Sequence, residues 1–457
     1  MLTDTITAIS TGGSSSGINI IRISGKNAKD IIDRIYTNKD KLNHQKIIYG
    51  KIINPSTNKV VDEVLVSYFK APNSFTGEDV CEINCHGGRK VTLDILNLVV
   101  VNGARLAEPG EFSKRAFLNG KMDLSKAEAI IDVINAKTSA QAKIASNQLE
   151  GGLYNKVELL RDKLVTLMAE IEVSIDYPEY DYEEISNDKL NNRLDEINKE
   201  LTLLIKTYDD GKYIKDGVNL AIVGNTNVGK SSLLNTLLNE EKAIVTDIEG
   251  TTRDVIEETL VIGNLVLNVS DTAGIRETED IVEAIGVNKS LKAIEDTDMI
   301  IYLIDLSRGI TSKDVELLNK IKELNKPYIV GLNKIDISRE NINKLKEQLK
   351  EHNYVIAIST ATREGIDELK QTIENIFNIS EFDSEENRIV VNERHKQLLE
   401  KAKERLIKAK EITMMGESLD IATIDIKEAT SLLGEITGKD ASSDVVNKIF
   451  EKFCLGK

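Results

Sequence analysis

Several features that this sequence lacks narrow the kind of protein it can be. No apolar run approaches the ~18 residues that a membrane-spanning helix needs, and the N-terminus lacks the basic-then-apolar pattern of a secretion signal. We therefore expect a cytosolic (cytoplasmic) protein with no membrane attachment. Only 3 cysteines occur among the 457 residues, and an odd number in a chain of this length argues against a disulfide scaffold.

An excess of positive charge is absent too. The 59 lysines and arginines face 75 aspartates and glutamates, which leaves a net charge of −16. A nucleic-acid partner would therefore need a local basic patch. Residues 394–410 are the best candidate for that patch, although such a run is more often the solvated face of a helix. The run contains Arg394, Lys396, Lys401, Lys403, Arg405, Lys408 and Lys410 against Glu400 and Glu404.

What is present is typical of a soluble globular chain of about three domains. Residues 1–120 look mixed α/β, with strands expected at 4–9, 18–23 and 60–69. A zinc site is one interpretation of Cys81, Cys85 and His86. However, a structural zinc site requires four ligands with paired spacing. Buried, reduced cysteines on a strand are the better interpretation.

Helical patterns flank the middle of the chain. Ser125 and Glu128 have the spacing of a capping box at the start of a helix. The acidic segment 176–188 is expected to be an exposed helix junction, and the chain turns helical again after the polar linker 381–386. A 4-3-4-3 repeat of apolar residues predicts the seam of packed helices, and its members are Leu190, Leu194, Ile197, Leu201 and Leu204.

Phosphate binding is the strongest single signal. Residues 218–232 read as a buried strand, then Gly224, a loop, and Gly229-Lys230-Ser231, which is the G-x-x-x-x-G-K-[ST] pattern between strand and helix. The glycines let successive backbone N–H groups point at the β-phosphate. Lys230 adds a charge between the β- and γ-phosphates, and the Ser231 hydroxyl can ligate Mg²⁺. The helix that follows directs its positive end at the same anion.

Four further motifs follow in the order that a GTP-binding domain requires. Gly250-Thr-Thr-Arg253 can place Thr252 on Mg²⁺, and a strand then presents Asp271-Thr-Ala-Gly274. A later strand ends in Asn333-Lys-Ile-Asp336, whose carboxylate can accept from guanine N1–H and its 2-amino group, and the backbone of 358–360 can contact guanine O6. Alternating strands and helices over 216–378 predict a doubly wound sheet of the Ras-like type. The residues predicted to bind GTP are Asn227, Val228, Gly229, Lys230, Ser231, Ser232, Thr246, Asp247, Ile248, Glu249, Gly250, Thr251, Thr252, Asp271, Thr272, Ala273, Gly274, Asn333, Lys334, Asp336 and Ser359.

The residue that orients the attacking water in Ras-like enzymes is missing. A glutamine follows the Asp-x-x-Gly motif in those enzymes, but Ile275 stands here and cannot form a hydrogen bond. Hydrolysis must therefore use polar groups from elsewhere. Asn227 is one candidate, because its amide oxygen could ligate a monovalent cation placed where an arginine finger would bring its charge.

With these residues in view, the whole chain resembles the tRNA-modifying GTPase family MnmE, also called TrmE. The matching stretches are 17–25, 73–88, 109–113, 115–121, the GTP motifs and the terminal Cys454-Leu-Gly-Lys457. The resemblance implies a multidomain α/β protein: an α+β folate-binding N-domain (1–120), a helical domain in two parts (121–215 and 380–457) and an inserted P-loop GTPase domain (216–379). It also implies a homodimer through the N-domains, a flavoprotein partner (MnmG) and tRNA. The implied chemistry adds an aminomethyl or carboxymethylaminomethyl group to C5 of the wobble uridine of certain tRNAs, with potassium-dependent GTP hydrolysis.

The resemblance also assigns site residues. Arg22, Glu82, Lys121 and Lys457 match the contacts to a reduced folate. The K⁺ ligands would be Asn227, Thr246, Ile248 and Thr251, and the Mg²⁺ ligands Ser231 and Thr252. Glu283 matches the glutamate that organises the attacking water, and Arg276 and Cys454 are further candidate catalytic residues.

Three departures from the family pattern and two alternative functions have to be considered. Cys81 and Cys85 are not part of the family pattern, so no catalytic role passes to them. Thr226 stands where many such GTPases have proline, and Thr360 replaces the usual alanine of the guanine-contacting motif. One alternative is a switch GTPase that only binds RNA or ribosomes; another is a folate-dependent one-carbon transferase regulated by GTP. The tail 454–457 and the set Arg22, Glu82 and Lys121 favour tRNA modification, because a simple switch needs neither.

Overall fold

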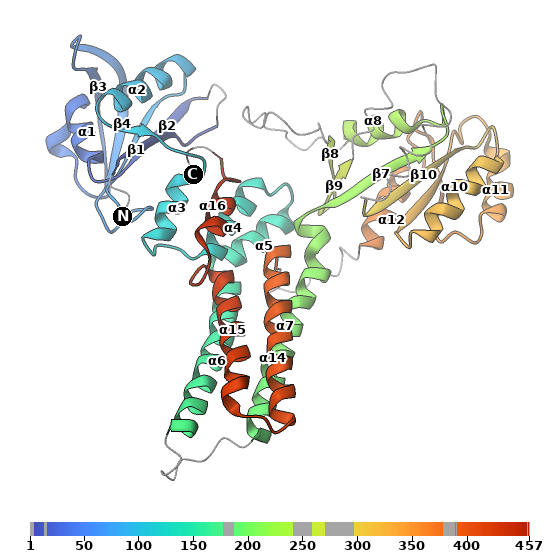
Figure 1. Cartoon of the computed structure of the whole chain (residues 1–457). Helices are drawn as coiled ribbons and strands as arrows, with labels where there is room; N and C mark the ends of the chain where they lie inside the picture. Colours follow the sequence, from blue (N-terminus) through green and yellow to red (C-terminus); the bar gives the residue numbers. More distant parts are fainter. Residues whose placement is uncertain are drawn as a thin grey trace.

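The computed structural model of the chain describes residues 4–12, 16–176, 187–240, 258–269, 297–377, 389, 391–454 and 456. Three bodies are apparent in it (Figure 1): a mixed sheet with helices at the N-terminus, a long helical bundle, and a second α/β body. The bundle extends away from the other two, and the last helix, α16 (Ser443–Phe450), returns the C-terminus to the N-terminal body. No helix of the described ranges is long and apolar enough to cross a membrane.

The N-terminal body is a six-stranded sheet in the order β3-β4-β5-β2-β1-β6, in which only the β1–β6 pair is parallel. The strands expected at 18–23 and 60–69 are confirmed as β2 and β4, and the first strand is shorter than expected because it begins at Ile6. Its elements are β1 (Ile6–Ile9), β2 (Ile18–Ser24), α1 (Ala28–Ile35), η1 (Lys39–Lys41), β3 (Lys46–Asn54), β4 (Lys59–Phe69), β5 (Val80–His86), α2 (Arg89–Val101), β6 (Arg105–Leu106) and α3 (Glu111–Leu118).

The cysteines of β5 belong to the core of this body. Cys81 and Cys85 are free thiols, buried in one apolar cluster with residues of α1 and α2. Burial raises the pKa of both thiols, because the thiolate would lose its hydration. The interpretation as buried, reduced strand cysteines is therefore confirmed.

Four long helices form the bundle: α6 (Gly152–Asp176), α7 (Asn187–Lys215), α14 (Glu393–Met414) and α15 (Leu419–Thr437). Two shorter helices, α4 (Leu124–Asn135) and α5 (Ser139–Leu149), lie between the bundle and the two α/β bodies. The predicted seam is confirmed, since all five of its residues on α7 are buried in the bundle core. The acidic segment joins α6 to α7, but positions 177–186 lie outside the described residues.

The capping box predicted from Ser125 and Glu128 is wrong. Asp123 caps α4 instead, and its Oδ1 accepts from the N–H of Lys126 at 3.0 Å. Glu128 consequently sits a turn further along, where its carboxylate accepts from Arg394 (2.8 and 3.0 Å) and from His395 (2.7 Å) of α14. The prediction failed because the helix begins before Ser125, and because Glu128 bonds to α14, which is distant in sequence, and takes no part in the cap.

This cluster ties together the two parts of the helical region. Arg394 also donates to the carbonyl oxygens of Glu435 and Ile436 near the end of α15, at 3.1 and 3.2 Å. His395 is fully buried, and burial lowers the pKa of its imidazole against the attraction of Glu128. Although burial alone would raise the pKa of Glu128, the charges and hydrogen bonds of His395 and Arg394 hold it below its usual range.

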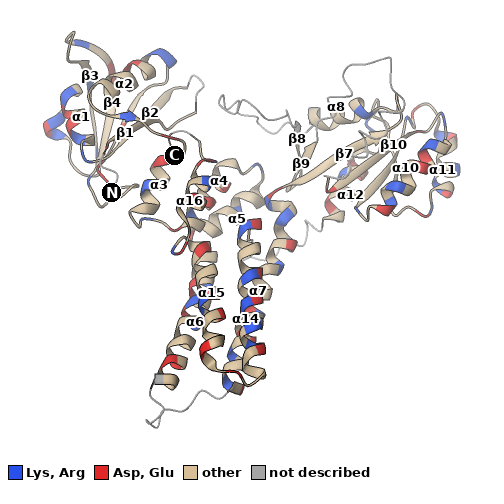
Figure 2. Cartoon of the chain, in the orientation of Figure 1, with Lys and Arg blue, Asp and Glu red and all other residues tan. Residues whose placement is uncertain are grey.

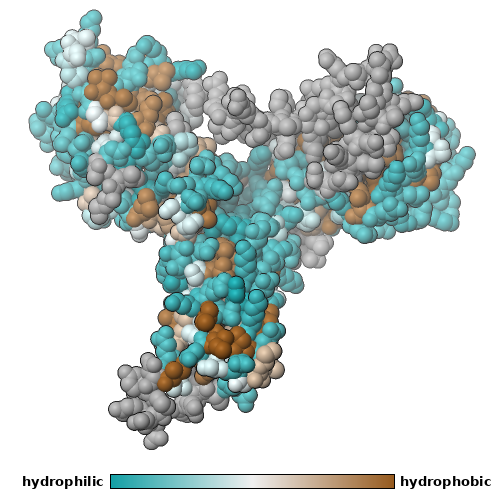
Figure 3. All heavy atoms as spheres, in the orientation of Figure 1, coloured by the Kyte–Doolittle hydropathy of each residue, from teal (hydrophilic) through white to brown (hydrophobic). Residues whose placement is uncertain are grey.

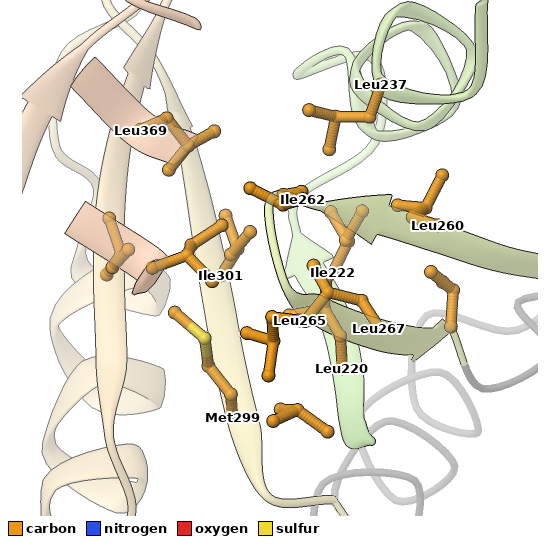
Figure 4. Close-up of a cluster of buried hydrophobic side chains, with 14 of the residues drawn as sticks. Leu220, Ile222, Leu237, Leu260, Ile262, Leu265, Leu267, Met299, Ile301 and Leu369 are labelled. Atoms are coloured by element: carbon orange, nitrogen blue, oxygen red, sulfur yellow. The ribbon is translucent and has the colours of Figure 1, made fainter. Parts of the chain in front are cut away.

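The third body has the strand order β12-β11-β10-β7-β9-β8, with only the β8–β9 pair antiparallel, so the doubly wound sheet is confirmed. Its apolar core (Figure 4) includes Leu220, Ile222 and Ile301, and Ala140 and Ile144 of α5 belong to the same cluster. The elements are β7 (Val218–Gly224), α8 (Lys230–Glu240), β8 (Glu258–Ile262), β9 (Leu265–Val269), β10 (Met299–Asp305), α10 (Ser312–Glu323), β11 (Tyr328–Asn333), η2 (Arg339–Asn341), α11 (Ile342–Gln348), β12 (Val355–Ala357) and α12 (Ile366–Ile376).

The division of the chain at 120, 215 and 379 stays a proposal. Position 120 falls in the connection between α3 and α4, and 215 is the last residue of α7, just before the connection to β7; 379 lies outside the described residues. Parallel strands β7, β10 and β11 end at the same edge of the sheet, and that edge carries the nucleotide motifs.

Candidate functional site

The phosphate-binding loop joins β7 to α8. At two of its positions only glycine fits, because a side chain would clash with neighbouring atoms. Gly224 and Gly229 have φ values of +150° and +100°. A Cβ on Gly224 would lie 2.4 Å from the carbonyl oxygen of Leu303, and one on Gly229 would lie 2.2 Å from Nδ2 of Asn333. The sequence pattern and the local packing therefore agree at both glycines.

Lys230 begins α8 and folds its side chain back over the loop. Its Nζ donates to the carbonyl oxygens of Gly224 (2.9 Å) and Asn225 (2.7 Å). Burial lowers the pKa of this ammonium group, because the charged form loses hydration. Ser231 in the first turn is exposed, as is Asn227, which has a φ of +62°. A cation, a hydroxyl and a helix N-terminus thus lie together, an arrangement that suits a polyphosphate.

Asn333 connects this loop to the segment predicted to recognise the base. Its Nδ2 donates to the carbonyl oxygen of Val228 (2.7 Å), and its Oδ1 accepts from the N–H of Thr360 (3.2 Å). Asp336 is exposed, and its Oδ1 accepts from the hydroxyl of Ser359 at 2.6 Å, which orients the carboxylate. The fold therefore brings together the predicted residues Val228, Asn333, Asp336 and Ser359.

The N–H groups of the segment 358–360 are already used within the chain. Those of Ile358 and Ser359 donate to the carbonyl oxygens of Leu332 (2.8 Å) and Glu364 (2.9 Å). This segment thus holds Asn333 and Asp336 in place, while its expected contact with guanine O6 stays a prediction.

Sequence reasoning missed the acidic partner of Lys334. The Nζ of Lys334 lies 2.6 Å from Oδ2 of Asp305, which ends β10 opposite Asn333 at the end of β11. Although burial alone would raise the pKa of Asp305, the bonds from Lys334 and Ser307 lower it. The one available signal was that Asp305, like Asn333, ends a buried strand.

Many predicted site residues lie outside the described residues, so their roles stay predictions. They are Thr246, Asp247, Ile248, Glu249, Gly250, Thr251, Thr252, Asp271, Thr272, Ala273, Gly274, Arg276, Glu283 and Lys457.

A second group of predicted residues meets in the N-terminal body. Arg22 on β2 and Glu82 on β5 are cross-strand partners, and Nε of Arg22 lies 2.9 Å from Oε1 of Glu82. The guanidinium carbon of Arg22 lies 5.4 Å from the ring centroid of Phe75 and 5.7 Å from that of Phe112. Lys121 donates to the carbonyl oxygen of Pro72 (2.9 Å), in the loop that carries Phe75. The fold therefore pairs Arg22 with Glu82 and connects Lys121 to the loop beside them.

The C-terminal tail packs against the same body. The carbonyl oxygen of Cys454 accepts from the N–H of Gly110 at 3.4 Å, and that of Gly456 accepts from the hydroxyl of Ser10 at 3.1 Å. A Cβ on Gly456 would lie 2.2 Å from the carbonyl oxygen of Ile9. Cys454 itself is exposed. Because β1 pairs with β2, the tail reaches the sheet next to the strand that carries Arg22.

Four of the seven cations in the basic run 394–410 are paired with acids of neighbouring segments. Both signs of charge alternate along the bundle (Figure 2). Among the described residues, acidic partners lie within 4.0 Å of Arg394 (Glu128), Lys396 (Asp209), Arg405 (Asp425 and Glu428) and Lys410 (Asp195). The run is thus mainly a salt-bridged helix face, which gives little support to a phosphate-binding patch. A solvated face was the more common expectation for such a run.

Comparison with known proteins covers the whole chain. The family model described as GTP-binding protein TrmE N-terminus matches residues 5–121, and the one described as MnmE helical domain matches residues 124–454. Among solved structures, Era in complex with MgGDPNP and nucleotides 1506–1542 of 16S ribosomal RNA is 35% identical, covers 35% of this chain and 56% of its own, and has a TM-score of 0.28.

Curated relatives align from end to end. The tRNA modification GTPase MnmE of Acetivibrio thermocellus is 47% identical over 460 residues, which is 99% of each chain. The protein of the same name from Thermoanaerobacter pseudethanolicus is 44% identical over 462 residues, which is 100% of each chain. This chain therefore belongs to the MnmE (TrmE) family of tRNA modification GTPases, and it is a GTP hydrolase that acts in tRNA modification.

Proposed function

We propose that this GTPase hydrolyses GTP in a potassium-dependent manner and, together with the flavoprotein MnmG, adds an aminomethyl or carboxymethylaminomethyl group to C5 of the wobble uridine of certain tRNAs. Its place of action is the cytoplasm, where its tRNA substrate is. One observation carries the proposal beyond GTP hydrolysis. The tail bearing Cys454 packs on the body that holds Arg22 and Glu82, an arrangement for which a simple nucleotide switch has no use.

The experiment that tests this function is nucleoside analysis of tRNA from cells that lack the protein. The expected result is loss of the C5-modified wobble uridines, restored by the wild-type gene but not by a Lys230→Ala variant. An unchanged nucleoside profile in the deleted strain would remove the proposed role.

Two metal ions belong to the proposed hydrolysis. The exposed hydroxyl of Ser231, at the start of α8, fits one ligand of Mg²⁺, and Thr252 is proposed as another. Asn227 is exposed at the tip of the loop and fits a K⁺ ligand, with Thr246, Ile248 and Thr251 proposed to complete the set. Mg²⁺ and K⁺ would supply positive charge to the phosphates when bound. The chain itself supplies the loop, Lys230 and the helix N-terminus that fix their position.

We predict that KCl raises the turnover of GTP roughly tenfold or more over NaCl at equal ionic strength, because Asn227 and the other proposed ligands would offer oxygens that can hold an ion of the size of K⁺, whose charge stabilises the transition state. The Asn227→Ala variant should lose most of this stimulation. Thr226→Ala, at the neighbouring exposed loop position that has no proposed ligand role, serves as the control for general damage to the loop. Equal rates in both salts for the wild type would contradict the cation site.

A reduced folate is the proposed ligand of the N-terminal body. Only one bond, Nε to Oε1, joins Arg22 to Glu82, so the other guanidinium nitrogens and Oε2 have no partner within the described ranges. The pair lies beside Phe75 and Phe112, and its side chains are 19% and 21% exposed. Polar groups at an aromatic surface suit a flat ring with hydrogen-bonding edges. Lys121 and Lys457 are proposed to complete the contacts.

We predict that the chain binds 5-formyltetrahydrofolate in calorimetry and that Glu82→Ala weakens the affinity by roughly tenfold or more, since a charge-assisted hydrogen bond is lost. Glu63→Ala is the matched control, because Glu63 lies on the neighbouring strand β4 and pairs with Lys51 instead. Absence of binding heat in the wild type, or equal weakening in both variants, would contradict the site.

Dimerisation through the N-terminal body is proposed on its exposed apolar surface. Ile47 and Tyr49 on the edge strand β3 are 65% and 56% exposed, and Leu65, the partner of Tyr49 on β4, is 43% exposed. Apolar groups are also visible on this body in Figure 3. An exposed edge strand with apolar side chains favours pairing with another copy. The contact with MnmG stays a proposal from the family resemblance.

A further inference from the structure

A buried carboxylate lies against the phosphate-binding loop and belongs to none of the GTP motifs. Asp314 is in the first turn of α10 and is 2% exposed. Its Oδ1 accepts from Nδ2 of Asn225 and from the hydroxyl of Tyr302, both at 2.7 Å. Its Oδ2 accepts from the N–H (2.8 Å) and the hydroxyl (2.6 Å) of Thr311. These four donors fill the acceptor capacity of an ionised carboxylate.

The carboxylate does more than its role in the helix cap requires. Thr311 and Asp314 form a capping box, which needs only the bonds between these two residues and is ordinarily solvated. Here the acid is buried and reaches two further elements. Tyr302, on the central strand β10, is fully buried, and its burial and its bond to Asp314 raise the pKa of the phenol. The hydroxyl therefore stays a donor that holds Oδ1 toward the loop.

Asn225 is the link from this carboxylate to the phosphate site. It follows Gly224, and the backbone carbonyls of these two residues are the ones that accept from Lys230 Nζ. Fixing the Asn225 side chain therefore fixes the position of the first half of the loop. The second half is held separately, by the bond from Asn333 to the Val228 carbonyl.

We propose that Asp314 is a positioning residue for GTP binding and hydrolysis: through Asn225 it anchors the first half of the phosphate-binding loop to α10 and β10. The backbone N–H groups of the loop must all point at the phosphates, so a loop released at one end binds them less well. Loss of the buried, charge-assisted bond should weaken nucleotide binding about tenfold.

A double-mutant cycle on the full-length chain tests this proposal. The affinities for GDP and for a non-hydrolysable GTP analogue are measured for Asn225→Ala, Asp314→Ala and the double variant. Each single change is expected to weaken binding about tenfold, and the double change by about the same amount, because both remove one contact. A double variant weakened by the product of the two single effects, about a hundredfold, would overturn the proposal.

Two further variants separate anchoring from stability. Thr311→Val removes the capping hydroxyl but keeps the contact between Asp314 and Asn225, so it should lower the melting temperature while nucleotide affinity stays within about twofold. If Thr311→Val weakens binding as much as Asp314→Ala, the cap and not the anchor is responsible.

The Asp314→Asn variant keeps the shape of the side chain, and the Asn225 amide can turn to form a hydrogen bond with it, so nucleotide affinity should be largely rescued. Should Asp314→Ala fail to fold, the Asn225→Ala variant decides, because Asn225 lies in the loop and is only partly buried: unchanged affinity would refute the anchor.

Discussion

Replacing Glu283 with alanine is expected to lower kcat for GTP hydrolysis by roughly 10²–10⁴-fold, while nucleotide affinity changes no more than a few-fold. In-line attack on the γ-phosphate needs a water held in position, and Ile275 cannot hold one. Glu283 follows the Asp-Thr-Ala-Gly motif closely, in a segment that begins acidic and turns apolar. It is the acidic residue that the family resemblance assigns to this task, directly or through a second water.

Single-turnover hydrolysis and equilibrium binding of a GTP analogue separate the two effects. Glu279→Ala is the matched control, because it removes an acid from the same segment without an assigned role. If Glu283→Ala hydrolyses GTP at the wild-type rate, or fails because it no longer binds GTP, the assignment is wrong.

The second large effect is expected at Arg115, which is the centre of the ion network in the N-terminal body. Its side chain is 1% exposed, and its guanidinium nitrogens lie 2.8 Å from Asp4, 2.9 Å from Glu111 and 3.1 Å from Glu78. Replacing Arg115 with methionine should destabilise this body by about 3–5 kcal/mol, because it removes the cation paired with Glu78 and leaves Arg105 alone to balance Asp4 and Glu111. Arg115→Lys should cost less, since it keeps the charge but not the fork.

The destabilisation caused by Arg115→Met should also depend on pH, and the direction of that dependence can be derived. Burial alone would raise the pKa of Asp4 and Glu111, but the bonds and charges of Arg105 and Arg115 hold both below their ordinary values of 3.8 and 4.5. A lowered folded-state pKa gives stability that is present above the ordinary value and is lost as the pH falls. The difference between wild type and Arg115→Met should therefore be largest near neutral pH and shrink below about pH 4.

Hydrogen exchange of peptides from β1 and α3, followed across this pH range, measures the effect within the intact chain. Arg89→Met is the control, because Arg89 is exposed at the start of α2 and should change stability by less than about 0.5 kcal/mol. Protection of Arg115→Met equal to that of the wild type would contradict the role of the network.

Much of the nucleotide site was predictable because its information is local. Gly224, Gly229 and Lys230 lie within one short segment, and the conformations that the loop needs select glycine at fixed spacing. The motif at 333–336 was found for a similar reason, since it directly follows a buried strand. The buried seam on α7 was equally predictable, because its apolar residues recur every three or four positions along a single helix.

The contacts between distant segments were decided only by the tertiary structure. The capping-box prediction for Glu128 failed because Asp123 caps α4 two residues before Ser125, and Glu128 bonds instead to Arg394, which lies 266 positions away. Part of the charge of the basic run was offset in the same way, by acids on other helices of the bundle. The link from Asn225 to Asp314, and from Asp314 to Tyr302, joins three segments that no local pattern connects. Local patterns thus determined which chemistry the chain carries, whereas packing determined which residues hold that chemistry in place, because burial and pairing depend on neighbours that sequence spacing does not specify.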